Sequence, residues 1–327
     1  MLVGAPWLLA HKSMLPIDRP IKVSLYGKDY VLWKDRNNDV RALPNVCSHM
    51  GAMLSAGWCE AREDGSSKVV CPFHALEFDA EGCTILPGSG KKTKPLVEPL
   101  ELVIRDDFIW SYGGYEPQRS IPDALDRVAA TYEFVGATAD TSVPTPLLAM
   151  LLNNHDYNHQ NGTHRDLFRI EEVQFQEFID RGHDSEAFFS APTASPTWRE
   201  VRRNPAVLML PKTIEAHLEN HFPSLVIFHA ENAIATIAQC HLFVPEGENR
   251  TRTYILLFAK PKNVGFKFMK QTFLNLSQTV VAQDTDILTR LYANSPQKIK
   301  LNNEVGMDWV RRNFKSWPAV DEPNLSR

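Results

Sequence analysis

The stretches 45–51 (NVCSHMG) and 71–74 (CPFH) decide how this sequence is interpreted. Each stretch supplies one cysteine and one histidine within a tight loop. Two thiolates and two imidazoles suit either a tetrahedral zinc ion or a [2Fe–2S] cluster whose two irons have different ligands. Zinc fingers usually group like ligands together. Because each loop here mixes one cysteine with one histidine, the spacing favours a Rieske-type cluster over zinc or a chance pairing, with the ligands Cys47, His49, Cys71 and His74.

Composition and charge are those of an ordinary folded protein. The 327 residues are 43% hydrophobic and carry a net charge of −4, without a long basic run, so we expect no nucleic-acid partner. The apolar stretch Leu2–Ala10 is far shorter than the ~20 residues that span a bilayer, so we expect no membrane partner and a cytoplasmic location. Five widely spaced cysteines do not form a disulfide framework.

The two parts of the chain differ in their predicted secondary structure. Residues 1–116 hold short runs of β-forming residues between turn signals, which predict a small barrel or sandwich. Glycines and prolines at 113–122 mark the expected boundary. Beyond it, a helix is predicted over residues 146–161, where Pro146 stands at the start and Gly162 just past the end. The later strand-like stretches predict one large antiparallel sheet; they are residues 168–178, 187–191, 214–218, 225–229, 233–244 and 252–258.

A long helix is predicted over residues 265–292. Its apolar residues recur at helical spacing and form a stripe from Phe266 through Val280 to Leu291. Asp284 stands where this stripe should continue, whereas Asp286 lies off it. Burying a carboxylate on a core stripe is costly unless a cation or hydrogen-bond donors meet it.

A cluster of polar residues lies at the end of the predicted helix 146–161. On helical spacing, Asn153, Asp156 and His159 share one face, and His164 could fold back towards His159. His155 and His159 are an alternative ligand pair on geometry alone, and a solvent-exposed polar helix end is a third interpretation. Two histidines together with Asp284 would form the facial triad that leaves positions open for O2 chemistry at Fe(II).

The motifs resemble those of the Rieske non-haem iron oxygenases. C-x-H and C-x-x-H match the family's cluster loops, and Asp156-x2-His159-x4-His164 matches its D-x2-H-x4-H motif. The resemblance implies an α+β fold: an all-β Rieske domain (residues 1–116), then a catalytic domain (117–327) with a large antiparallel sheet packed by helices, of the helix-grip or START-like type. It also implies that His159, His164 and Asp284 bind iron and that His155 is incidental.

The resemblance further implies a mechanism. Enzymes of this family pass electrons from the [2Fe–2S] cluster to a mononuclear Fe(II), with O2 as co-substrate. Asp156 matches the carboxylate that links the cluster of one subunit to the iron of its neighbour in a homotrimer. Asn153, three residues before the motif on the same predicted helix face, is a candidate catalytic residue beside it. Because the chain has neither a C-x4-C-x2-C ferredoxin motif nor a convincing nucleotide loop, we expect a separate ferredoxin or flavin reductase as the electron donor.

The substrate is less clearly indicated. The chain resembles the vanillate O-demethylase-like branch, which implies a small-molecule substrate, such as an aromatic acid, that is hydroxylated or demethylated. Asn220 and His241 have spacings similar to a polar substrate-binding pair of that branch, although a local hydrogen-bonding role is an equally good interpretation. A ring-hydroxylating dioxygenase and a non-catalytic Rieske electron-transfer protein are the alternatives. The chain departs from the family's usual Gly-Trp at Ala75 and Leu76 and has a long spacer between its loops.

Overall fold

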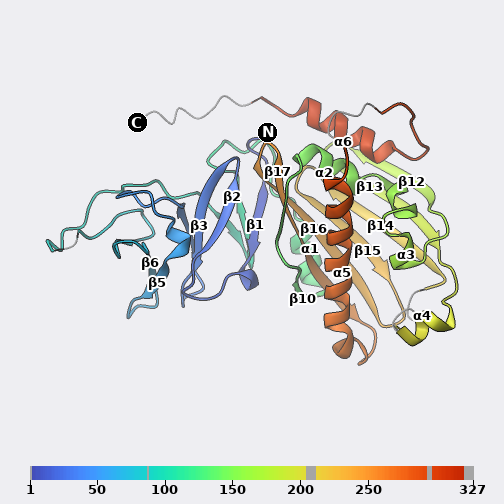
Figure 1. Ribbon diagram of the computed structural model, residues 1–327, viewed down its shortest axis with the longest axis horizontal. Helices are drawn as coiled ribbons and strands as arrows, with labels where there is room; N and C mark the ends of the chain where they lie inside the picture. The colour runs from blue at the N-terminus through green and yellow to red at the C-terminus, as the bar shows by residue number, and fades with distance from the viewer. Residues whose placement is uncertain (1, 87, 204–210, 293–296, 320–327) are drawn as a thin grey trace.

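Two β-rich units lie side by side along the longest axis of the molecule (Figure 1). The computed structural model describes residues 2–86, 88–203, 211–292 and 297–319. Among these residues, no helix is both long and apolar enough to cross a membrane. The two ends of the expected domains, Met1 and residues 320–327, lie outside the described residues.

The N-terminal unit consists of three antiparallel three-stranded sheets, β1-β9-β8, β2-β3-β4 and β5-β6-β7. This arrangement confirms the predicted all-β character. Its elements are β1 (Trp7–His11), η1 (Lys12–Met14), β2 (Ile21–Leu25), β3 (Lys28–Lys34), β4 (Val40–Pro44), η2 (Leu54–Ala56), β5 (Trp58–Ala61), β6 (Ser67–Val70), β7 (Glu77–Phe78), β8 (Val103–Arg105) and β9 (Phe108–Ser111).

The C-terminal unit is built on one antiparallel sheet with the strand order β10-β17-β16-β15-β14-β13-β12, in which β11 also pairs with β17. The predicted large antiparallel sheet is therefore confirmed. Its strands are β10 (Glu133–Ala137), β11 (Thr141–Val143), β12 (Gln174–Arg181), β13 (Asp184–Pro192), β14 (Thr213–His221), β15 (Leu225–Glu231), β16 (Ala235–Gly247) and β17 (Arg250–Pro261). Its helices are α1 (Ala124–Thr131), α2 (Leu147–Asn154), η3 (Tyr157–Asn161), α3 (Arg165–Phe168), α4 (Trp198–Arg203), α5 (Phe266–Thr289) and α6 (Val305–Ser316).

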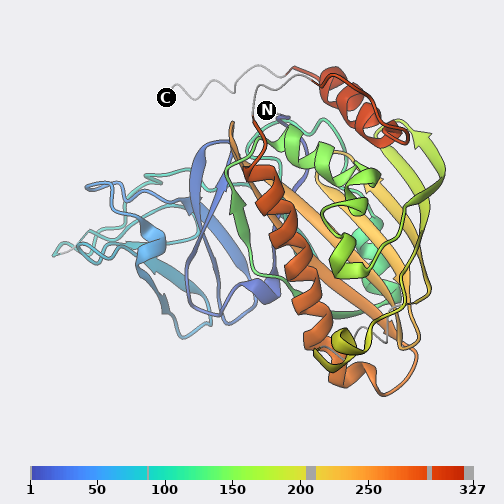
Figure 2. The ribbon, with the colours of Figure 1, turned by 45° about the vertical axis from the view of Figure 1, so that its right-hand side comes forward.

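The long helix α5 crosses one face of this sheet, and α1 covers the opposite face (Figures 1 and 2). The alternation of side chains along the strands explains the two coverings. On β15, Ile227 packs with the α1 residues Leu125 and Val128, whereas the neighbouring Phe228 lines a cavity under α5. The sheet thus has one face closed by a core and one face that helps to form a cavity.

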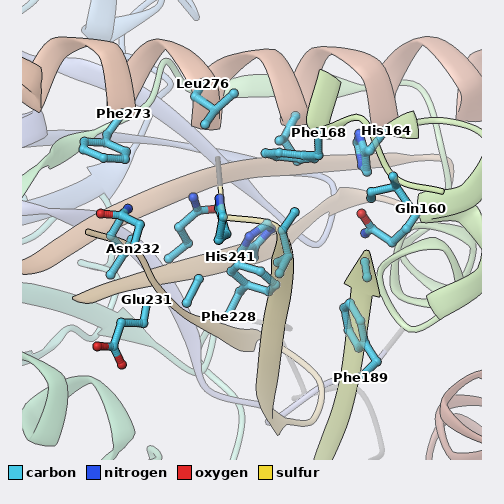
Figure 3. Close-up of a pocket in the computed structure, with 18 of the residues that line it drawn as sticks. Gln160, His164, Phe168, Phe189, Phe228, Glu231, Asn232, His241, Phe273 and Leu276 are labelled. Carbon is cyan, nitrogen blue, oxygen red and sulfur yellow. The ribbon is translucent and has the colours of Figure 1, made fainter. Parts of the chain in front are cut away.

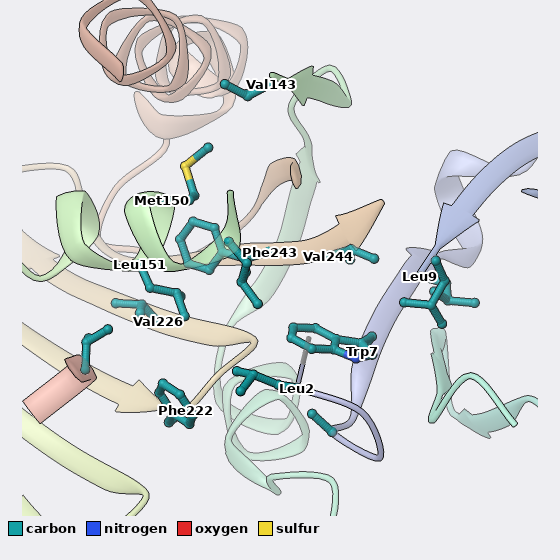
Figure 4. Packing of buried hydrophobic residues seen from close by; sticks show 14 of the residues in the cluster. Leu2, Trp7, Leu9, Val143, Met150, Leu151, Phe222, Val226, Phe243 and Val244 are labelled. Carbon is teal, nitrogen blue, oxygen red and sulfur yellow. The ribbon is translucent and has the colours of Figure 1, made fainter. Parts of the chain in front are cut away.

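The two units share a continuous hydrophobic core (Figure 4). Leu2, Trp7 and Leu9 belong to the same buried cluster as Val226 and Phe243 of the large sheet. Because the core crosses between the units, they pack as one body. β9 ends at Ser111 and α1 begins at Ala124, so the expected boundary at 116/117 falls in the connection and stays a prediction.

Three sequence-based expectations are wrong in detail. The helix predicted over 146–161 ends at Asn154, because Asp156 is extended (φ −87°, ψ 92°) and its side chain accepts a hydrogen bond from Asn158 N, which starts the separate turn η3. The strand predicted over 168–178 begins only at Gln174, because Arg169 adopts a left-handed conformation (φ 58°) where α3 ends. The stripe on α5 does not continue past Asp284: Ile287 and Leu291 are exposed, and Leu288 is buried instead.

Candidate metal centres and substrate cavity

The two loops of the first candidate site have the same backbone design. In each, the cysteine N–H donates to a carbonyl five residues later, Ala52 O or Leu76 O, both at 2.9 Å. The cysteine carbonyl accepts from the residue four positions later, and that residue has positive φ: Gly51 at 75° and Ala75 at 54°. Ala75 therefore occupies a conformation that favours glycine. At this position the related family usually has glycine, and the backbone shows why.

These loops bring like ligands together. His49 Nδ1 lies 3.2 Å from His74 Nδ1, and both rings are exposed. Cys47 and Cys71 are buried in one small core cluster, where burial and then the neighbouring Cys71 raise the pKa of the Cys47 thiol. Two nitrogens bound to one tetrahedral ion at about 2.1 Å lie about 3.4 Å apart, so this spacing suits a histidine pair on one iron and a cysteine pair on the other.

A single ion is not favoured at these loops. Among the described residues, the one group of three or more metal-binding side chains whose ligand atoms all lie within 4.8 Å of one another is His159, His164 and Asp284. The two cysteines and two histidines are not gathered around one point. Their donor set therefore fits a two-iron cluster better than one zinc ion.

The second candidate site is assembled from three separate elements. His159 comes from η3, His164 is the residue just before α3, and Asp284 comes from the second-last turn of α5. The Nε2 atoms of His159 and His164 lie 3.6 Å and 3.2 Å from Asp284 Oδ1. The break in the predicted helix is what turns His159 towards α5.

Hydrogen bonds from neighbouring residues fix the orientation of the two histidine rings and of the Asp284 carboxylate. His159 Nδ1 donates to Asp156 O, and His164 Nδ1 lies 2.8 Å from Gln283 Oε1. We assign both Nδ1 atoms as protonated, so both Nε2 atoms carry lone pairs that can bind a metal; that of His159 accepts a hydrogen bond from Gln160 Nε2 at 3.2 Å, which a bound metal would replace. Asn153 Nδ2 donates to Asp284 Oδ1 at 3.1 Å, so Asn153 does reach the site, although not through a shared helix face.

Electrostatics at the triad favour a positive charge. Burial alone would raise the pKa of Asp284, but the contacts with His164 and His159 outweigh it and hold this pKa below its ordinary value. Burial lowers the pKa of His159, which keeps its imidazole neutral as a ligand requires. His164 Nε2 is buried without a hydrogen-bond partner, because its contact with Asp284 lacks hydrogen-bonding geometry. An orphaned lone pair, a second imidazole and a carboxylate at one point fit a mononuclear iron.

The side chains of two other predicted residues lie outside the triad. His155 is buried, stacks on Trp309 with ring centroids 5.3 Å apart, and has its Nδ1 2.8 Å from Leu151 O. Its role is thus in packing, and the His155–His159 ligand pair is not formed. Asp156 is half-buried and caps η3 through its bond from Asn158 N at 3.0 Å.

The predicted substrate pair is only half assembled. His241 lines the cavity, where burial lowers the pKa of its imidazole to about 4. Asn220 is fully buried, donates to Ser185 Oγ at 3.1 Å and is not among the residues that line the cavity. Asn220 Oδ1 is buried without a hydrogen-bond partner among the described residues, and the substrate-binding role of Asn220 stays a prediction.

The cavity lies between the sheet and α5 and has a volume of about 190 Å³ (Figure 3). His164 and Gln160 stand at one end, Glu231 and Asn232 at the other, and His241 lies between them. The apolar stripe of α5 therefore lines a cavity here rather than filling a core. Sequence reasoning missed Gln239, Gln160 and the supporting Gln283; the alternation along β16 from His241 would have indicated Gln239.

Comparisons with known proteins cover both units. Residues 6–95 match the family model "Rieske [2Fe-2S] domain", and residues 150–312 match "Vanillate O-demethylase oxygenase C-terminal domain". The oxygenase component of dicamba O-demethylase from Stenotrophomonas maltophilia is 26% identical over 74% of this chain and 77% of its own length. Aminopyrrolnitrin oxygenase from Pseudomonas fluorescens is 26% identical over 50% of this chain, which spans only 46% of that protein.

Solved structures show the same fold. The crystal structure of dicamba monooxygenase bound to 3,6 dichlorosalicylic acid superposes with a TM-score of 0.75, at 19% identity, over 96% of this chain and 97% of that chain. Fold and donor sets together define an oxidoreductase with one iron–sulfur site and one mononuclear iron site. The chain belongs to the Rieske-type oxygenases, with the C-terminal domain of the vanillate O-demethylase branch. The cofactors of such a protein are a [2Fe–2S] cluster and a mononuclear non-haem iron.

Proposed function

We propose that this protein is a terminal oxygenase component. It takes electrons at Cys47, His49, Cys71 and His74, holds iron on His159, His164 and Asp284, and uses O2 to hydroxylate or oxidatively demethylate an organic substrate. The observation that carries the proposal is the convergence of three ligand atoms, with one of the three residues, His164, lining an apolar cavity, in a chain whose other unit is a Rieske domain.

Iron held by two imidazoles and a carboxylate keeps open positions for O2 chemistry. The chain's own residues prepare this site. Asp156 O and Gln283 Oε1 accept the Nδ1 protons, so each histidine presents Nε2, and Asn153 holds Asp284 in place. Phe168 and Phe189 line the same cavity as His164, and an apolar lining of this kind would limit the access of water to a reactive centre.

The test uses two aspartates two residues apart on α5. Asp284→Ala removes a proposed ligand, whereas Asp286→Ala removes an exposed carboxylate that pairs with Arg290. Asp284→Ala should lower the iron content from about three to about two atoms per chain, abolish the EPR signal that nitric oxide gives with mononuclear Fe(II), and keep the signal of the reduced cluster. Asp286→Ala should keep the full iron content, the nitric oxide signal and the cluster signal. Loss of the cluster signal in Asp284→Ala would contradict the division into two sites.

Turnover gives the second readout. A monooxygenase places one atom of labelled O2 in its product, and the Asp284→Ala variant should lose at least about 100-fold in rate, since removal of an outer partner alone costs 10–100-fold. Two labelled atoms in the product would instead identify a dioxygenase.

Electron delivery is proposed to involve other chains. The loops that carry the cluster ligands lie at the end of the molecule away from α5, with β1, β2 and β3 between them (Figure 1). A homotrimer that places one subunit's exposed His49 and His74 near the next subunit's Asp156 would shorten this path, and a separate ferredoxin or flavin reductase would supply the electrons.

This arrangement has its own test. Asp156→Asn should leave both metals bound but slow single-turnover electron transfer, whereas Asp166→Asn on the exposed surface of α3 should not. Sedimentation should give three chains per particle. A monomer with full single-turnover rates would contradict both the trimer and the bridge.

A further inference from the structure

Gln160 stands where two cavities meet. A smaller cavity of about 50 Å³ adjoins the cavity under α5, and all three members of the triad line it, whereas only His164 of the triad lines the larger one. Six residues line both cavities: Gln160, His164, Phe189, Phe228, His241 and Val280. Gln160 lies beside His164 at one end of the larger cavity (Figure 3). A ligand that extends from the larger cavity towards the triad therefore passes Gln160.

The side chain of Gln160 is bonded to a proposed ligand atom. Gln160 Nε2 donates to His159 Nε2 at 3.2 Å, and this is the one side-chain hydrogen bond that Gln160 makes with the described residues. Because the Nδ1 proton of His159 goes to Asp156 O, Nε2 has a single lone pair. That lone pair can meet either the Gln160 amide or a metal, but not both. A metal on His159 therefore leaves the amide without its partner.

The backbone around Gln160 keeps the freed amide at this junction. Gly162 N donates to His159 O at 3.0 Å, and Asn161 Oδ1 accepts from Val173 N at 2.8 Å. Since these bonds fix the chain on both sides, the part of Gln160 that can move is its side chain. A carboxamide has two N–H donors and an acceptor oxygen, so after its release it can bond to a ligand in the larger cavity.

We infer that Gln160 couples metal binding at the triad to ligand binding in the cavity under α5. In the metal-free chain His159 holds the amide; with a metal on His159 the amide turns and donates to a carbonyl or similar acceptor on the ligand. Gln160 is thus a positioning residue for a ligand with an acceptor next to its ring. The inference rests on the proposed function in taking the triad as the metal site. Since such coupling is reciprocal, metal and ligand should each bind more tightly when the other is present.

The first measurement is the affinity of a small ketone in the presence and absence of metal. The cavity volume of about 190 Å³ slightly exceeds the ~150 Å³ of an engineered cavity that takes benzene, so one ring with short substituents fits. para-Fluoroacetophenone is such a ring with a carbonyl acceptor, and fluorine NMR follows its binding to the protein that carries its cluster. Loading the triad with Zn(II), a diamagnetic ion that takes histidine and carboxylate ligands, should lower its Kd by about 5-fold, the effect of one hydrogen bond. para-Fluorotoluene, which has no acceptor, should bind equally with and without Zn(II).

Two variants test whether Gln160 carries this effect. In Gln160→Leu, which keeps the bulk without the amide, the Kd of the ketone should no longer respond to Zn(II), whereas Gln271→Leu at an exposed position of α5 should keep the response. Gln160→Ala serves if Gln160→Leu does not fold. Without the ketone, Gln160→Leu should also bind Zn(II) about 5-fold more tightly than the wild type, because the ion no longer replaces a hydrogen bond. General damage to the site would weaken binding of the ion instead.

A Zn(II) response that persists in the Gln160 variants, or that is absent from the wild type with Zn(II) at the triad, would overturn the inference. Asp284→Ala decides whether the ion is at the triad, since this variant should lose the bound zinc measured per chain. Zinc retained by Asp284→Ala would contradict the proposed function and the inference with it. A ketone Kd that ignores triad-bound zinc would overturn the inference alone and leave the proposed function standing.

Discussion

The two candidate metal sites are built in opposite ways. The cluster site is made of two loops of equal design, each with both of its ligands two or three residues apart, and its histidines face solvent. The triad draws two histidines from η3 and the start of α3 and adds Asp284 of α5, more than a hundred residues further along the chain; His164 is buried and His159 half-buried. An exposed site suits exchange of electrons with another protein, and a buried one suits chemistry on a substrate shielded from water.

The largest effect should come from removing a ligand of the exposed site. Cys71→Ser should abolish the visible and EPR signals of the cluster and, with them, turnover, because a serine oxygen is a poor ligand for this cluster. The separate construction of the triad predicts that the nitric oxide signal of mononuclear iron remains. If this signal disappeared as well, the two sites would not be independent and the comparison would break down.

The next effect concerns the support of the buried site. Gln283→Leu removes the acceptor for His164 Nδ1 and should weaken iron binding by about 10–100-fold without changing the cluster signal. Titration of the metal-depleted mononuclear site with Fe(II) measures this affinity. Gln271→Leu, at an exposed position of the same helix where the side chain bonds only to Asn275, is the matched control. Full iron affinity in Gln283→Leu would show that the triad needs no support from α5 beyond Asp284.

The different construction also explains what the sequence could predict. The cluster ligands are close in sequence, so their spacing alone indicates which loops hold them. The triad was proposed only through a family motif and the interrupted stripe at Asp284, because no local pattern shows that the helix breaks at Asp156 and turns His159 towards α5. Gln239 lines the cavity although sequence reasoning missed it, and Asn220 does not line it, for a similar reason: which face of a strand borders a cavity depends on how the whole sheet packs.

A smaller effect concerns the backbone of the cluster loops. Ala75 has φ 54° at the position where the equivalent loop has Gly51. Ala75→Gly should therefore relieve strain and raise the free energy of unfolding by about 1 kcal/mol. Urea unfolding monitored through the visible absorbance of the cluster would measure the gain. Gly51→Ala is the reciprocal change and should cost a similar amount; no difference in either variant would show that these loops do not limit the stability of the Rieske unit.

The smallest effect is a pH dependence of opposite sign in the two regions. Burial between Phe108 and Phe134 lowers the pKa of His11, which therefore stays neutral in the folded protein. For His221 burial also acts to lower the pKa, but Asp184 and Glu219, at 2.6 and 2.9 Å, outweigh it and raise this pKa above 6.5. Arg119 and Arg127 also pair with these carboxylates, and His229 lies near Glu219.

Linkage gives the sign of each contribution. Below pH 6.5 the unfolded chain protonates His11 more readily than the folded chain does, so stability falls as the pH falls towards and through the lowered pKa. The contribution of His221 is complete below pH 6.5 and is lost as the pH rises through the raised pKa. His11→Gln should therefore flatten the acid side of the stability profile and His221→Gln the alkaline side, each by about 0.5–1 kcal/mol. Unfolding free energies measured from pH 5 to pH 9 would check both, and a variant that flattened the opposite side would contradict the assignment of His11 as neutral and His221 as charged.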